Sequence, residues 1–330
     1  MARIKIIGHE GGTSDITKYS SYSGATVISS TGLDMDSNYC LDCNAATEYA
    51  GVAFTADDEM YTAFLYRPTT LDNVCPISFW SGGTLIFSLR IFADGSINAN
   101  AGGVLASSFT GLMTANATRF MEVYYKLADS GGRISVKING VVVQGLDFTG
   151  DTKPSTDATF DAIRFGSAGV STLTQGFAYF DNIILDTTAW IGKTYIQGLA
   201  VTGAGATTQL TPSAGNNYAC VDEIPASATD YVYSNTNNHI DTYVAGDLTG
   251  TIGTIKSVSV NACAIKEGAA TPTNLQLVTR PGSTDRVSAD VAIPTSYAVL
   301  QAIWELNPDT SAAWVEAEVN ATEIGIKVVA

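Results

Sequence analysis

The segment from Arg119 to Phe148, "RFMEVYYKLADSGGRISVKINGVVVQGLDF", carries the clearest signal of secondary structure in the chain. Apolar and polar side chains alternate along 121–127 and again along 133–138, which is the period of a half-buried β-strand. Asn139-Gly140 then gives the strongest short hairpin signal, because both residues tolerate the positive φ of a type I′ turn. Val141 to Val143 return as the partner strand. The stretch therefore predicts an antiparallel meander.

Working outward, other segments have the same short, turn-bounded character. In the first half they are "MYTAFLYRP" (60–68), "SFWSGGTLIFSLRIFADGSINA" (78–99), "ATFDAIRFGS" (158–167) and "GFAYFDNIILDTTAW" (176–190). In the second half they are "TIKSVSVNACAIKEG" (254–268), "TNLQLVTRPG" (273–282), "SYAVLQAIWEL" (296–306) and "EIGIKVVA" (323–330). These segments predict strands in both halves of the chain.

The composition changes after Trp190 to the Gly-, Thr- and Ala-rich run of residues 198–223, which places a domain boundary near Gly192. One short helical turn is expected within 307–321, capped by Asp309 or Thr310. The sequence thus predicts an all-β protein of two antiparallel, jelly-roll-like β-sandwich domains, covering residues 1–192 and 193–330.

Composition limits the function classes. The chain has 330 residues, of which 45% are hydrophobic and 15% charged, with 17 Lys+Arg against 32 Asp+Glu and a net charge of −15. Such an acidic protein is repelled by phosphate, so nucleic acid and anionic membranes are not expected partners. The N-terminus shows no signal peptide, and no apolar run approaches the roughly 20 residues of a membrane helix. We therefore expect assembly in a cytoplasm, where structural disulfides are rare.

Cys40 and Cys43, in "NYCLDCN" (38–44), have the spacing of zinc knuckles and dithiol redox sites. Cys75, Cys220 and Cys263 are isolated in the sequence, so a four-ligand zinc site lacks its second pair. On a strand, residues three apart lie roughly 10 Å apart along the chain, beyond the reach of a disulfide. The expected interpretation is an early strand with Tyr39 and Leu41 on one side and Cys40 on the other, and a metal or disulfide role is the alternative.

Two acidic pairs have a spacing that glycosidase carboxylates can have. Asp57 and Glu59 have an i, i+2 spacing, as do Glu316 and Glu318. Glycosidases place two carboxylates on either side of the scissile bond. The first pair is expected at a turn before a strand and the second on a solvated helical turn, so no catalytic residue is predicted. His9 and His239 lack a nucleophile-elbow context such as Gly-x-Ser-x-Gly.

Two acidic loops are candidate calcium sites, because calcium binds carboxylate and carbonyl oxygens. They contain Asp34, Asp36 and Asn38 in "LDMDSN", and Asp151 and Asp157 in "DTKPSTD". Neither matches an EF-hand loop, so hydrated turns are expected, and no metal or cofactor is predicted.

Aromatic side chains beside polar groups are the remaining candidates for a ligand surface. The candidates, which lie near strands or turns, are Tyr61, Tyr66, Trp80, Tyr124 and Tyr179. Tyr61, Trp80 and Tyr124 form the predicted ligand surface, and core packing is the alternative for all five. Asp181, within "YFDNI", is expected to be a partly buried structural acid bonded to backbone amides.

At this level of detail the chain resembles a known family. The run "VYYKLADSGGRISVKINGVVV", with "DFTGDT", "ATFDAIRFGS" and "YFDNI", resembles the laminin-G-like, concanavalin-type jelly rolls of bacteriophage virion proteins, over roughly residues 1–192. The segments "GAGATTQLTPSAGNNYACVDE", "TDYVYSNTNNHIDTYVAGDL", "KSVSVNACAIKEG" and "TSYAVLQAIWELNPDTSAAWVEAEVNATEIGIKV" resemble a C-terminal module of tailed-phage structural proteins.

The resemblance implies a non-enzymatic virion protein: a capsid decoration, tail-associated or fibre subunit. Its expected partners are copies of itself in a symmetric oligomer such as a trimer, and other capsid or tail proteins. The second domain is expected to be the docking or oligomerisation module. A carbohydrate-binding adhesin that recognises a host-surface glycan is the alternative function, and a glycoside hydrolase using Asp57 or Glu59 is a third.

Overall fold

The computed structural model describes residues 3–29, 33, 39–43, 45, 47–167, 178–268 and 272–330. Within these residues the chain is built from β-strands and contains a single short α-helix, so the predicted all-β class is confirmed. No helix among them is long and apolar enough to cross a membrane. The chain divides into two compact units: Met1–His9 with Lys18–Ile196, and Glu10–Thr17 with Gln197–Ala330.

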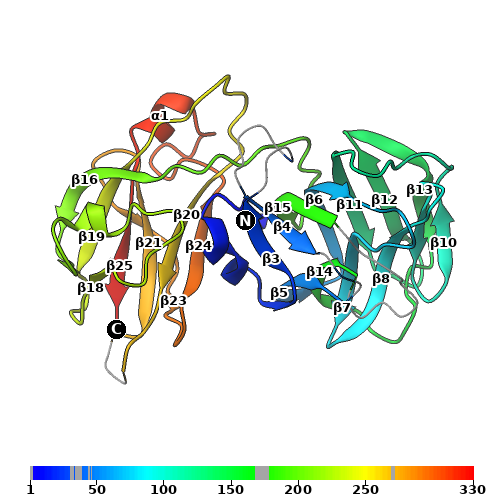
Figure 1. Ribbon diagram of the computed structural model, residues 1–330, viewed down its shortest axis with the longest axis horizontal. Helices are drawn as coiled ribbons and strands as arrows, with labels where there is room; N and C mark the ends of the chain where they lie inside the picture. Colours follow the sequence, from blue (N-terminus) through cyan, green and yellow to red (C-terminus); the bar gives the residue numbers. More distant parts are fainter. Residues whose placement is uncertain are drawn as a thin grey trace. The chain divides into compact units, whose positions relative to one another are not determined.

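The first unit is a sandwich of two antiparallel sheets (Figure 1). Its described residues form an eight-stranded sheet in the order β13-β12-β11-β6-β15-β4-β3, with β1 also paired to β15. The strands are β1 (Arg3–Ile7), β3 (Thr26–Ser29), β4 (Tyr39–Cys43), β6 (Glu59–Pro68), β11 (Arg119–Lys126), β12 (Gly132–Ile138), β13 (Val141–Gly150) and β15 (Ala178–Asp186). A 3₁₀ helix, η1 (Gly12–Lys18), follows β1 in the sequence, and its residues up to Thr17 belong to the second unit.

The second layer is a seven-stranded sheet in the order β10-β9-β8-β7-β14-β5-β2, counted over the described residues. Its strands are β2 (Ser21–Ser23), β5 (Tyr49–Asp57), β7 (Ile77–Ser81), β8 (Thr84–Ile91), β9 (Ile97–Asn100), β10 (Val104–Ser107) and β14 (Phe160–Gly166). Aromatic rings from the inner faces of both sheets interdigitate, and Phe87 of β8 stacks on Tyr125 of β11 with ring centroids 4.4 Å apart. The core of the first unit lies between the two sheets.

The antiparallel meander predicted for residues 119–148 is confirmed. β11 pairs with β12 from Met121↔Ile138 to Lys126↔Arg133, and β12 pairs with β13. Asn139 and Gly140 have φ of 51° and 83°, the positive values that the type I′ turn requires. The Asn139 side chain also accepts a hydrogen bond from the Phe120 backbone N–H at 3.0 Å, which fixes the turn against the neighbouring strand.

The predicted strand at Cys40 and Cys43 is also confirmed, because both residues belong to β4. This strand lies between β3 and β15, and Cys40, Leu41 and Cys43 are all fully buried. Neither thiol is part of a disulfide bond. Burial of the Cys43 thiol raises its pKa well above the usual value, because the thiolate would lose its hydration. The two side chains are therefore small interior groups of a central strand.

The second unit is centred on a six-stranded antiparallel sheet, counted over its described residues, in the order β16-β19-β25-β21-β22, with β23 also paired to β21. These strands are β16 (Val201–Thr208), β19 (Ile240–Ala245), β21 (Asn274–Arg280), β22 (Arg286–Val287), β23 (Val291–Ala292) and β25 (Glu323–Val329). Two strand pairs and two helices complete the unit: β17 (Thr211–Pro212) with β18 (Val232–Tyr233), β20 (Val258–Ala264) with β24 (Ala298–Trp304), η2 (Asn217–Cys220) and α1 (Glu316–Asn320).

The helical turn predicted within 307–321 is present as α1, but its predicted cap is wrong. The N-cap is Val315, not Asp309 or Thr310. Asn307 closes a separate turn first: its side-chain oxygen accepts the Asp309 N–H at 2.9 Å, and its carbonyl accepts the Ser311 N–H. The helix begins only after this turn, where the Glu318 carboxylate accepts the Val315 N–H at 3.2 Å.

Candidate functional site

A polar outer face on the seven-stranded sheet is one candidate site. Along β8, Phe87 and Leu89 point into the core and are fully buried, so Ser88 and Arg90 point to the opposite, outer face. In β9 the same alternation leaves Asn98 and Asn100 on that outer face. Ser88 is paired with Asn100 and Arg90 with Asn98, so the four polar side chains form one block across two strands.

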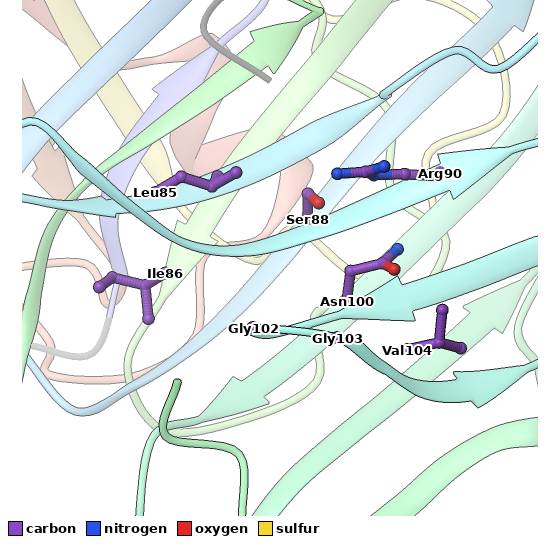
Figure 2. Close-up of a pocket in the computed structure, with 8 residues that line it drawn as sticks. All are labelled: Leu85, Ile86, Ser88, Arg90, Asn100, Gly102, Gly103 and Val104. Atoms are coloured by element: carbon purple, nitrogen blue, oxygen red, sulfur yellow. The ribbon is translucent and has the colours of Figure 1, made fainter. Parts of the chain in front are cut away.

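This block forms one wall of a pocket of about 340 Å³ (Figure 2). The pocket is lined by Leu85, Ile86, Ser88, Arg90, Asn100, Gly102, Gly103 and Val104. Arg90 is the single charged group in this lining. Ser88 is only 1% exposed, and its hydroxyl has no hydrogen-bond partner among the described residues. A buried hydroxyl without a partner loses its hydration and gains nothing in return, so a ligand that bonds to it is favoured.

Two glycines shape the pocket at the β9–β10 turn. Gly102 has φ of 67°, and a Cβ there would lie 3.0 Å from the Pro154 side chain. Gly103 has no such restriction, and a Cβ added there would enter open space. The turn therefore keeps the mouth of the pocket clear, and position 103 is a place where a side chain can block it.

Trp80 lies further along the same outer face but is not an exposed platform. It is 5% exposed, and its indole N–H donates to the Ser78 hydroxyl at 2.8 Å. The Arg164 guanidinium lies over its ring at 4.0 Å and over the Tyr49 ring at 4.5 Å, so a Tyr49–Arg164–Trp80 stack crosses three strands. Leu85, which lines the pocket, packs against Trp80. Trp80 thus supports the pocket wall.

Tyr61 and Tyr124, the other two predicted ligand residues, lie on the outer face of the eight-stranded sheet. They are paired across β6 and β11, and their rings stack with centroids 4.3 Å apart. Trp190 contacts both rings edge-on, at 5.4 and 6.1 Å, and the Lys137 ammonium lies 3.8 Å from the Trp190 ring centroid. The structure brings Tyr61 and Tyr124 together and leaves Trp80 on the other sheet.

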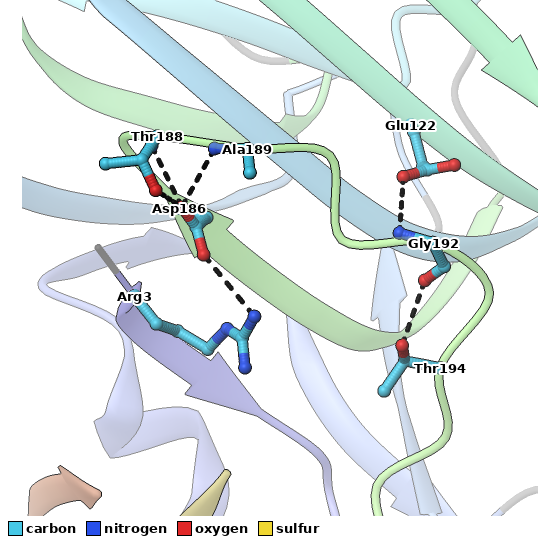
Figure 3. Close-up of polar contacts among 7 residues, drawn as sticks. All are labelled: Arg3, Glu122, Asp186, Thr188, Ala189, Gly192 and Thr194. Atoms are coloured by element: carbon cyan, nitrogen blue, oxygen red, sulfur yellow. Dashed lines mark hydrogen bonds and ion pairs between the residues drawn. The ribbon is translucent and has the colours of Figure 1, made fainter. Parts of the chain in front are cut away.

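The segment that brings Trp190 into place, residues 187–196, is held at several points (Figure 3). Asp186 at the end of β15 accepts the backbone N–H groups of Thr188 and Ala189, at 2.9 and 3.3 Å, and pairs with Arg3 at 3.4 Å. Glu122 of β11 is 1% exposed and accepts the Gly192 N–H at 2.8 Å. Sequence patterns did not predict this covering segment, because the residues that it covers lie far away in sequence; Glu122, for example, is 70 positions from Gly192.

The acidic pairs and His239 lie at element ends, in α1 or in a turn. Asp57 ends β5 and Glu59 begins β6, as expected for a turn before a strand, and Glu59 accepts the Tyr124 hydroxyl at 3.1 Å. Glu316 and Glu318 lie in α1. In the turn before β19, the Nδ1 atom of His239 is 3.0 Å from the Ser234 hydroxyl.

Asp181 differs from its expected state, because it is completely buried and not partly buried. Its Oδ1 atom accepts the Asn182 N–H at 2.8 Å and lies 2.8 Å from His9 Nδ1, and His9 Nε2 is 3.0 Å from the Tyr19 hydroxyl. The strand β15 and the segment after β1 thus share a buried Asp–His–Tyr network. Its principal side-chain partner, His9, is 172 residues away in sequence, which is why local pattern gave only backbone amides.

One of the two candidate calcium loops belongs to the described residues, and the other does not. Asp34, Asp36 and Asn38 lie outside the described residues. Asp151 accepts the Lys153 N–H at 2.9 Å, and Asp157 accepts the Ser155 hydroxyl at 2.6 Å, so both carboxylates take part in local turns. Among the described residues, no three His, Cys, Asp or Glu side chains gather as a metal ion requires.

The second unit carries a separate feature, an exposed tyrosine patch. Tyr231, Tyr233 and Tyr297 are 44%, 55% and 41% exposed. The first two rings lie 6.1 Å apart, and the Tyr297 hydroxyl donates to the Ala228 carbonyl at 3.5 Å, which places it beside the same loop. The second unit contains eight of the fourteen exposed large apolar side chains found in the described residues, although it is the smaller unit.

Comparison with known proteins gives only distant structural likeness. No protein-family model matches the chain, and no curated protein matches its sequence. Among solved structures, the cellulose-induced protein Cip1 is 12% identical with a TM-score of 0.40, covering 53% of this chain and 91% of that one. The alginate lyase Aly36B is 16% identical (TM-score 0.39; 56% and 97%). A Bacillus subtilis protein of unknown function with a galectin-like fold is 14% identical (TM-score 0.37; 57% and 96%).

Proposed function

We propose that this chain is a non-enzymatic structural protein of a bacteriophage particle, assembled in the host cytoplasm and acting through protein–protein contacts. The observation that carries the proposal is the tyrosine patch of the second unit. Tyrosine is enriched at interfaces, because its ring buries a large apolar area at low entropic cost while its hydroxyl keeps a polar partner. The resemblance of the sequence to phage virion proteins supports the same function.

In this role the second unit is the docking module, and its partners are further copies of the chain and neighbouring capsid or tail proteins. Exposed apolar side chains gathered on one loop region are typical of an interaction surface, whereas single scattered ones are not. The first unit has a packed aromatic core, in which Phe79, Phe87 and Tyr125 are fully buried, and this core provides no docking surface in this role.

Mass measurement by light scattering tests the proposal, with the Tyr231→Ser/Tyr233→Ser variant compared with the wild-type chain. We expect the wild type to form a defined oligomer, and the variant to dissociate and to lose co-sedimentation with purified particles. Tyr22→Ser is the matched control, because Tyr22 is 51% exposed but belongs to β2 of the first unit. A wild-type chain that stays monomeric and binds no particle component contradicts the proposal.

The pocket on the seven-stranded sheet favours a second candidate function, an adhesin that binds a host-surface glycan. Its volume lies in the range of small-ligand sites, and it combines apolar walls with a few polar groups. Both functions are compatible in one particle protein. A glycan array with the purified chain tests the second, since a purely structural protein gives no dose-dependent signal.

A further inference from the structure

We propose that the pocket on the seven-stranded sheet binds a saccharide unit that carries a carboxylate, such as a uronic acid residue. The inference rests on the second candidate function, glycan binding, and narrows it to a chemical class. Three features of the lining support it: its single charged group, its unbonded hydroxyl and its size.

The charge comes first. Arg90 is the one ionised group among the eight lining residues, in a chain whose acidic residues outnumber its basic ones by 32 to 17. A guanidinium presents a planar fork of donors that matches a carboxylate in a bidentate pair. A neutral sugar offers only hydroxyl groups to these donors, and a hydroxyl cannot form the bidentate pair of opposite charges that a carboxylate forms with a guanidinium.

The hydroxyl of Ser88 and the amide of Asn100 provide the second recognition element. The two side chains are direct neighbours across β8 and β9, and Figure 2 shows them beside Arg90 on the same wall. Ser88 is buried without a hydrogen-bond partner among the described residues, so a ligand hydroxyl placed there satisfies a group that is otherwise unpaired. Sugar hydroxyls both donate and accept, which suits a serine and an amide.

The apolar lining completes the fit. Leu85, Ile86 and Val104 can cover the C–H face of a sugar ring, while the polar wall contacts its edge. A volume of about 340 Å³ accommodates a small ligand rather than a long chain, so one or two saccharide units fill it. Small inorganic anions would bond to Arg90 but leave the apolar walls and Ser88 without contacts.

Ligand-observed NMR on the full chain tests this, with D-glucuronate, D-glucose and acetate as probes. Glucose lacks the carboxylate and acetate lacks the sugar. We expect saturation transfer to glucuronate alone, with affinity at least about tenfold weaker in Arg90→Gln, as the loss of a charge-assisted bond predicts. Gly103→Tyr is expected to abolish binding by filling the pocket, because a Cβ there meets open space.

Two controls separate specific from general effects. Arg133→Gln removes the same charge from an exposed residue of the other sheet, and Gly253→Tyr adds the same side chain at an open glycine of the second unit, so both should bind glucuronate like the wild type. Equal binding of glucose that is lost in Gly103→Tyr overturns the acidic class but keeps glycan binding. Equal binding of acetate overturns the saccharide. Absence of any binding overturns both the acidic class and glycan binding. None of these results affects the proposed role in the phage particle, which the measurement of oligomeric mass tests.

Discussion

Replacing Asp241 with alanine should selectively unfold the second unit. Asp241 lies in β19, is completely buried, and accepts hydrogen bonds from the Gln209 and Leu210 backbone N–H groups, the Asn217 amide and the Tyr243 hydroxyl. One carboxylate therefore ties together β19, η2 and the segment after β16. Burial, and next the Asp241 charge, raise the pKa of Tyr243, so its hydroxyl remains a donor at any ordinary pH.

The magnitude follows from which donors have another acceptor. Gln209 N–H also reaches the Ile240 carbonyl at 3.2 Å, and the Asn217 amide also donates to the Leu210 carbonyl at 2.8 Å. The Leu210 N–H and the Tyr243 hydroxyl have no second acceptor among the described contacts. Two buried donors left unpaired, at about 1–3 kcal/mol each, give a loss of about 4 kcal/mol in the free energy of unfolding.

Graded variants sharpen the prediction. Asp241→Asn keeps one acceptor oxygen and should lose about 2–3 kcal/mol, and Tyr243→Phe removes a single bond and should lose about 1–2 kcal/mol. Denaturant unfolding gives the free energies, and hydrogen exchange resolved by peptide assigns the loss to β19 and β25 rather than to β6 and β11. Two results would contradict this role of Asp241: a loss of less than about 1 kcal/mol in the unfolding free energy of Asp241→Ala, or an equal loss of hydrogen-exchange protection in the first unit.

Three further perturbations test the first unit. Trp190→Ala should lower the free energy of unfolding of the first unit by about 2–3 kcal/mol, because the Trp190 contacts with Tyr61 and Tyr124 disappear. Tyr195→Ala, in the same segment, should change this free energy little. Equal effects of the two variants in a thermal melt would contradict the packing of Trp190. Asn139→Ala should lose about 1–2 kcal/mol in denaturant unfolding, because alanine disfavours φ of 51° and cannot bond to Phe120; an unchanged midpoint would contradict it.

Burial raises the pKa of the Cys75 thiol to about 12, against 9.0 for an unperturbed thiol. Between these pH values the unfolded chain binds fewer protons than the folded chain, so the free energy of unfolding falls by up to about 1.4 kcal/mol per pH unit. The Cys75→Ala variant should show a shallower slope of unfolding free energy against pH, and a slope identical to that of the wild type would contradict the buried thiol.

How much could be predicted differs between fold and site. The alternation in 121–127 and 133–138 and the Asn139-Gly140 pair define the meander, because strand period and turn geometry are properties of adjacent residues. The same holds for the β4 strand that contains Cys40 and Cys43. The predicted N-cap of α1 was wrong because Asn307, Asp309 and Thr310 all favour turns, and local propensity does not determine which turn forms.

The amino-acid sequence thus defines the all-β class, the strands of the meander, β4 and the hairpin at 139–140, since each depends on side chains only a few residues apart. Only the tertiary structure decided that Trp80 supports a pocket wall on one sheet while Tyr61 and Tyr124 lie under Trp190 on the other. It also decided that Asp181 pairs with His9, and that the Ser88 hydroxyl is buried beside Arg90 with no hydrogen-bond partner in the described part of the chain. These outcomes depend on which sheet each strand joins, and strand pairing over long sequence separations is set by the packing of the whole sandwich.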